Sequence, residues 1–152
     1  MKLTVAMFPD TYKFLLRKMS DDKYNEKDKE VYRAVCLSYF QNSLRRKTYL
    51  PNLLKRKASN RLTNDYLIEL SADKIRKFRD EQEVDWEANV KFNCFLRKQL
   101  KIEFMAFMKG AVTFGKQTVV QSVENFKGLY DLSDDDIKSE NLIRYYHRFK
   151  SA

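Results

Sequence analysis

One stretch of the chain concentrates cationic side chains without any acidic ones. Between Glu30 and Asp65 the sequence holds eight Lys and Arg residues and no Asp or Glu. The whole chain has 30 Lys and Arg against 21 Asp and Glu, so this stretch supplies nearly all of the net charge of +9. These residues, the basic window, are Arg33, Arg45, Arg46, Lys47, Lys55, Arg56, Lys57 and Arg61. Arginine offers forked donors to phosphate oxygens and lysine offers point charge. Such a field usually faces a polyanion, most often nucleic acid, although a solvated helix pair is the simpler alternative.

A second, shorter cluster of basic and aromatic residues lies near the C-terminus. Its cations are Arg144, Arg148 and Lys150, and its aromatic residues are Tyr145, Tyr146 and Phe149. Aromatic rings at a basic surface can stack on unpaired bases. The favoured alternative places Phe149, with Tyr145 or Tyr146, in the core.

Residues that could support catalysis do not form a recognisable pattern. His147 is the single histidine and has basic neighbours, so we expect it to lie exposed on a helix. A nucleophile–base pair between His147 and Cys36 or Cys94 has no supporting motif. The run from Asp134 to Asp136 lacks the alternating ligands of a calcium loop. We therefore expect no enzyme activity, no catalytic residue, no cofactor, no metal and no small-molecule substrate.

The same acidic run is explained by helix chemistry. Ser133 followed three residues later by Asp136 is a capping-box pattern, and it predicts that the last helix begins there. Cys36 and Cys94 are predicted to be small buried residues, which favours a reducing, cytoplasmic location. The sequence has no apolar run near 18 residues, so we expect no membrane partner.

Hydrophobic periodicity predicts the elements of the N-terminal half. Residues 2–7 alternate as a strand, and Pro9 then begins a helix with a stripe of Tyr12, Leu15, Leu16 and Met19. A second helix is expected over 27–44, burying Val31, Val35 and Tyr39 or Phe40. A second strand over 65–71, a short helix at Ile75 and Phe78, and a long helix over 86–109 follow.

Composition and element order together predict a mainly α fold. Gly 3 and Pro 2 are few for a chain of 152 residues. The order strand–helix–helix occurs twice within residues 1–110, and we expect the two strands to form a short antiparallel ribbon over the helices. Residues 111–152 are expected to form a helical hairpin packed on this core, with Gly110 ending the long helix. That helix is apolar on more than one side, which favours a homodimer.

The first unit resembles a known family of DNA-binding proteins. KLTVAMFPDTYKFLLRKM followed by NEKDKEVYRAVCLSYF is similar to ribbon-helix-helix proteins of the MetJ and Arc type. The resemblance implies that paired strands enter the DNA major groove, with Lys2, Thr4 and Ala6 facing outward. The second unit would supply the partner strand within the same chain, as in tandem members, and would present Leu67 and Glu69 outward.

The whole chain also resembles small proteins carried by phages and mobile elements of Bacteroidetes. That resemblance implies a role in regulation, in transfer, or in defence and counter-defence. The sequence therefore favours a non-enzymatic nucleic-acid-binding protein, with DNA preferred over RNA. The alternative is a protein-interaction module, such as an adaptor or inhibitor, whose basic surface meets an acidic partner.

Overall fold

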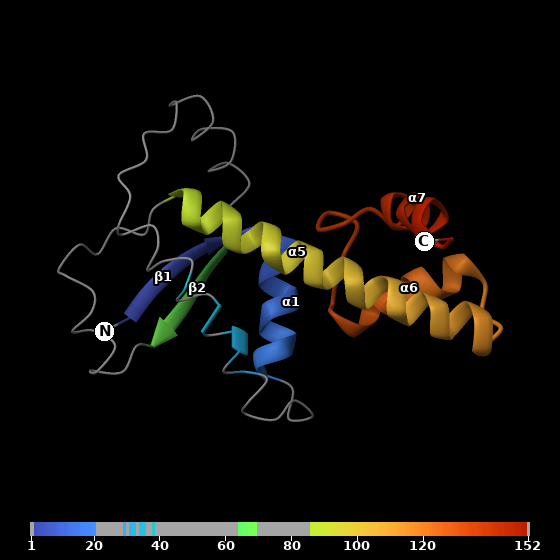
Figure 1. Cartoon of the computed structure of the whole chain (residues 1–152), viewed down its shortest axis with the longest axis horizontal. Coiled ribbons are helices and arrows are strands. Elements are labelled where there is room, and N and C mark those ends of the chain that lie inside the picture. The colour runs from blue at the N-terminus through green and yellow to red at the C-terminus, as the bar shows by residue number, and fades with distance from the viewer. Residues whose placement is uncertain are drawn as a thin grey trace. The chain divides into compact units, whose positions relative to one another are not determined.

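The computed structural model describes residues 2–20, 29, 31–32, 34–35, 38, 64–69 and 86–151. Its elements are β1 (Lys2–Met7), α1 (Pro9–Ser20), β2 (Asn64–Glu69), α5 (Trp86–Met108), the π-helix η1 (Lys109–Phe114), α6 (Val119–Leu129) and α7 (Ser139–Phe149). Figure 1 labels all of them except η1. Over the described residues the chain is mainly helical, which confirms the predicted class. It divides into two compact units, residues 1–95 and 96–152, which we treat separately.

The N-terminal unit contains a two-stranded antiparallel sheet (Figure 1). Strand β1 pairs with β2, and the register sets Lys2 opposite Glu69 and Thr4 opposite Leu67. Val5 and Met7 are fully buried while Ala6 between them is only half-buried, as expected of a strand with one inner face. Residues 2–7 and 64–69 are therefore strands that pair with each other, and residues 70–71 of the second predicted strand lie outside the described residues. The expected repetition of two strand–helix–helix units stays a prediction, because residues 70–85 lie outside the described residues.

Helix α1 begins at Pro9 as predicted, but it buries a different face. The inner positions are Thr11, Phe14, Leu15 and Lys18, whereas Leu16 is 38% exposed. Of the predicted stripe, Leu15 is buried, Tyr12 and Met19 are half-buried, and Leu16 is wrongly placed because it lies exposed. The buried face differs from the predicted one because two polar residues of α1 are buried together with interaction partners. The Thr11 hydroxyl donates to the Phe8 carbonyl, and the Lys18 ammonium lies 5.5 Å from the Phe14 ring centroid. An apolar pattern does not reveal polar residues of this kind.

The second predicted helix is described at a few positions, and those are helical. Val31 is 58% exposed, so its predicted burial is wrong. Instead the Tyr32 ring meets the Phe14 ring edge-on, with centroids 6.4 Å apart. Val35 is half-buried, and Tyr39 and Phe40 lie outside the described residues.

Helix α5 confirms the long helix, and the buried apolar side chains described on it form one stripe. Phe92, Leu96, Leu100, Phe104 and Met108 recur every four residues and are at most 3% exposed. Cys94 is an exposed free thiol, so its predicted burial is wrong. Gly110 does not end the helix either: the chain continues as η1, and the Gly115 N–H donates to the Gly110 carbonyl at 3.0 Å. That five-residue spacing is the π-helical pattern.

The C-terminal unit contains α6 and α7, which pack against each other. Thr118 caps α6 in a capping box: the Gln121 N–H donates to the Thr118 hydroxyl at 3.2 Å, and the Gln121 side chain accepts from the Thr118 N–H. Ser133 and Asp136 also bond as the sequence pattern predicts, with Ser133 N to Asp136 Oδ2 at 2.8 Å. However, they close a turn, and α7 begins later, at Ser139.

Candidate functional site

The eight residues of the basic window all lie outside the described residues, so the structure gives no geometry for the principal predicted site. Lys2 and Thr4, the strand positions implied by the family resemblance, lie on β1. Arg144 and Arg148 lie on α7, with Lys150 directly after it.

Two carboxamides of α5 bond to the backbone of β1 on the edge that β2 leaves free. The Ala6 N–H donates to Asn89 Oδ1 at 3.1 Å, and the Ala6 carbonyl accepts from Asn93 Nδ2 at 3.0 Å. Asn89 and Asn93 are four residues apart, so they lie on the same face of the helix. The N–H and the carbonyl of Ala6 therefore both form hydrogen bonds, and the two asparagine side chains take the place of the backbone of a third strand.

Asn93 is fully buried and uses both ends of its side chain. Its Oδ1 accepts from the Phe8 N–H at 2.9 Å and also meets the Thr11 hydroxyl. Its Nδ2 donates to the carbonyls of Ala6 and of Asn89, the latter at 2.7 Å. The amide orientation is unambiguous, because one end faces a backbone donor and the other faces two acceptors. Sequence reasoning missed this group, although two asparagines spaced by four on an apolar helix were a visible signal.

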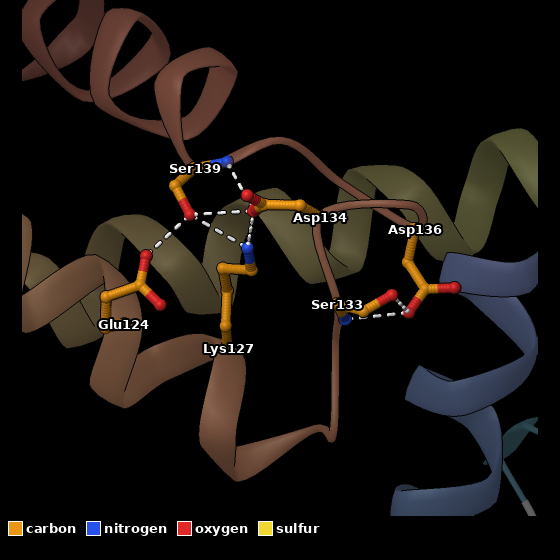
Figure 2. Close-up of polar contacts among 6 residues, drawn as sticks. All are labelled: Glu124, Lys127, Ser133, Asp134, Asp136 and Ser139. Atoms are coloured by element: carbon orange, nitrogen blue, oxygen red, sulfur yellow. Dashed lines mark hydrogen bonds and ion pairs between the residues drawn. The ribbon is translucent and has the colours of Figure 1, made fainter.

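A buried lysine ties α6 to the start of α7 (Figure 2). The Lys127 side chain is 5% exposed, and its ammonium bonds to the Asp134 carboxylate and to Ser139 Oγ, the latter at 2.8 Å. The Ser139 hydroxyl lies 2.6 Å from Glu124 Oε1 and 3.0 Å from Asp134 Oδ1, and the Ser139 N–H points to the same Asp134 oxygen at 3.3 Å. A buried charge requires partners of this kind. We call these four residues the Lys127 cluster.

The Lys127 cluster contains a serine and a lysine in contact, a pair that can act as nucleophile and base when the amine is neutral. Here the Lys127 side chain forms an ion pair with Asp134. The hydrogen bonds from Lys127 and then Ser139 lower the pKa of Asp134 below its ordinary value of 3.8, which favours the ionised carboxylate. The arrangement therefore fits a structural tie between two helices.

We expect Asp134→Asn to lower the melting temperature at neutral pH, because the buried Lys127 ammonium loses its charged partner. The effect is moderated by water, since the Asp134 side chain is 72% exposed. A carboxyl whose pKa is lowered by folding contributes stability above its unfolded value, and that contribution is lost as the pH falls through the folded pKa. The difference between wild type and variant should therefore shrink as the pH falls below 3.8.

Thermal melts followed by circular dichroism across this pH range provide the measurement. Asp135→Asn is the matched control, because Asp135 is the exposed neighbour and carries the same charge. Equal melting temperatures for Asp134→Asn and Asp135→Asn at neutral pH would show that the Lys127 cluster does not hold the hairpin.

An aromatic row runs through the C-terminal unit from its core to its surface. Phe104 and Phe126 are buried with ring centroids 5.1 Å apart, and Tyr145 lies 6.4 Å from Phe104. Phe149 follows at 4.6 Å from Tyr145 and is 40% exposed. The prediction that Tyr145 packs in the core is thus confirmed in part, since this ring is half-buried. The same prediction for Phe149 is wrong, because Phe149 lies at the surface.

One exposed cation contacts the Tyr145 ring, and further exposed cations lie at the end of α7. The Lys101 ammonium of α5 lies 5.1 Å from the Tyr145 ring centroid, a cation–π distance. Arg148 and Lys150 are exposed on and after the last turn of α7. Arg144 is exposed as well, but it forms an ion pair with Glu140 one turn earlier. His147 is exposed and its ring lies 5.6 Å from that of Tyr146.

Among the residues that the structure describes, no group of three or more His, Cys, Asp or Glu residues could hold a metal ion. Within the same part of the chain, no helix is both long enough and apolar enough to cross a membrane.

By its described elements, the chain belongs to the class of mainly helical proteins that carry a small antiparallel sheet. Comparisons with protein-family models, with curated proteins and with solved structures give no match.

Proposed function

We propose that this chain is a non-enzymatic nucleic-acid-binding protein with a regulatory or accessory role, and that it binds through the basic window. The observation that carries the proposal is the sequence between Glu30 and Asp65, with its eight cations and no acid. Neutralising several phosphates releases the counterions condensed on a nucleic acid, which favours binding without any base-specific contact. DNA is preferred over RNA as the partner because of the family resemblance.

The exposed cations of the C-terminal unit add support. Lys101, Arg148 and Lys150 are exposed and lie on or beside α5 and α7. A protein that binds a polyanion benefits from a second positive surface, since charges on several elements contribute to the attraction.

The tandem ribbon-helix-helix arrangement is part of the proposal for the fold. Antiparallel pairing of β1 with β2 is the feature that supports it. The register, however, sets Glu69 opposite Lys2 and Asp65 opposite Ala6, so two acidic residues of β2 pair with strand positions that the resemblance assigns to DNA contact. Acidic residues at these positions do not favour phosphates, and we assign the main electrostatic contacts to the basic window, with Lys2 and Thr4 in a minor role.

A salt series on the wild-type chain tests the proposal directly. A fluorescent duplex of arbitrary sequence is titrated by anisotropy at several salt concentrations. We expect log Kd to rise linearly with log salt, with a slope of about 0.9 for each phosphate contacted. A chain that binds neither DNA nor RNA at low salt would contradict the proposed function.

The second candidate function is a protein-interaction module with an acidic partner. The exposed apolar residues favour it, since Phe114 is 80% exposed and Ile102 is 61% exposed. Single exposed apolar residues are common on protein surfaces, which is why we rank this function second. Tight binding to polyglutamate with no binding to oligonucleotides would reverse the order.

We also propose that the chain forms a homodimer, which would double the positive surface presented to a nucleic acid. We expect light scattering at micromolar concentration to give twice the chain mass of 18.2 kDa. Ile102→Glu introduces a charge at an exposed position of α5 and should shift the population toward monomer if that side of the helix is the interface. A monomer mass for the wild type would contradict this prediction.

A further inference from the structure

The aromatic row of the C-terminal unit ends at its surface among cations. Phe104 is fully buried, Tyr145 is half-buried and Phe149 is 40% exposed, so the row leads outward along successive ring contacts. Packing of the core accounts for the rings of Phe104 and Tyr145, but it does not require an aromatic side chain at the exposed position of Phe149. The exposed ring lies on the last turn of α7, beside the exposed Arg148.

The charges at this end suit a chain of phosphates. Lys101 is held over the Tyr145 ring, and Arg148 is one turn from Tyr145 on the same helix. Over the described residues, Arg148 has no ion-pair partner, whereas Arg144 is paired with Glu140. Cations at the last turn also interact favourably with the helix dipole, but that effect requires no neighbouring ring.

We propose that Lys101, Tyr145, Arg148 and Phe149 form a binding surface for single-stranded nucleic acid, with an unpaired base stacking on Phe149. The inference rests on the proposed function and specifies the kind of nucleic acid that this surface binds. Bases in a duplex are already stacked on each other, so an exposed ring stacks more readily on an unpaired base. Stacking is tolerant of sequence because every base has a π face, and the cations contact the backbone on either side.

Phe149→Leu is the central test, because it keeps an apolar side chain against Tyr145 and removes the ring. The probes are a fluorescent oligo(dT) of about 12 nucleotides, oligo(U) of the same length, and a DNA duplex. We expect Phe149→Leu to weaken oligo(dT) binding about tenfold and to leave duplex binding nearly unchanged. Phe149→Tyr keeps a ring and should bind like wild type. Comparing oligo(dT) with oligo(U) shows whether the strand is DNA, RNA or either.

Matched variants separate this surface from general charge and exposure. Phe114→Leu removes an aromatic ring that is 80% exposed in η1 and should leave the affinity unchanged. Arg148→Gln should lower the salt slope for oligo(dT) by about 0.7, and Arg144→Gln should have a smaller effect because Glu140 already pairs with that arginine. Melting curves confirm that each variant is folded.

Several outcomes overturn the inference. The first is an oligo(dT) affinity that Phe149→Leu leaves unchanged. The second is an equal loss of affinity of Phe149→Leu for the duplex and for the single strand. The third is a loss of oligo(dT) affinity in Phe149→Tyr equal to that in Phe149→Leu. Displacement of oligo(dT) by polyglutamate as effectively as by unlabelled oligo(dT) would point instead to an acidic protein partner. A wild type that binds no nucleic acid rejects the proposed function and this inference together, whereas a wild type whose binding does not depend on Phe149 rejects this inference alone.

Discussion

Replacing six cations of the basic window should abolish nucleic-acid binding at physiological salt and leave the fold intact. The substitutions are Arg45, Arg46, Lys47, Lys55, Arg56 and Lys57 to Gln or Ser. If each cation neutralises one phosphate, their loss removes about 5 from the slope of log affinity against log salt. At about 0.1 M salt the affinity should fall by a thousandfold or more. Anisotropy titrations with duplex DNA and with single strands provide the measurement.

The control for this variant must change the net charge equally at other places. Arg17, Lys91, Lys98, Lys109, Lys116 and Lys138 are six exposed cations outside the basic window, and they can be replaced by Gln together. This control should keep most of the affinity, because counterion release depends on charges that lie against the phosphates. If both sixfold variants lose affinity equally, the positive charge acts diffusely and the basic window is not the site.

Asn93→Leu should destabilise the N-terminal unit severely. Leucine has a similar volume, but it leaves the Phe8 N–H and the Ala6 carbonyl without their bonds to this side chain, at a position that is 0% exposed. Each buried backbone group left unsatisfied costs about 1–3 kcal/mol, so the expected loss of unfolding free energy is about 2–5 kcal/mol. That is a large fraction of the total stability of a domain. Urea denaturation followed by circular dichroism measures it, and amide exchange at Phe8 locates it.

Asn141→Leu is the matched control for that substitution. Asn141 is an exposed helical asparagine of α7, so replacing it should change the unfolding free energy by no more than about 0.5 kcal/mol. An Asn93→Leu variant as stable as Asn141→Leu, with unchanged exchange at Phe8, would mean that the Asn93 bonds do not hold β1 against α5.

The sequence predicted the elements wherever hydrophobic periodicity is strong. Alternation in residues 2–7 corresponds to β1, in which Val5 and Met7 are buried, because a buried face must be apolar at the period of its element. Ends of elements were harder to predict. Gly110 fails to end a helix because the backbone continues with π-helical bonds, and Asp136 closes a turn with Ser133 before α7 begins. Local chemistry at these points allows more than one hydrogen-bonding pattern.

The sequence alone determined the mainly helical class, the positions of the two strands and the concentration of charge in the basic window, since these depend on local pattern and composition. Only the tertiary structure decided which polar residues are buried. Thr11, Asn93 and Lys127 lie inside because distant groups satisfy them: Thr11 and Asn93 meet each other and the Phe8 backbone, and Lys127 meets Asp134 and Ser139. Burial of a polar group is favourable only when its partners are in place, and those partners are brought together by folding. For the same reason, the sequence could place Arg148 and Phe149 on one helix, but only the fold brings Lys101 to the same aromatic surface.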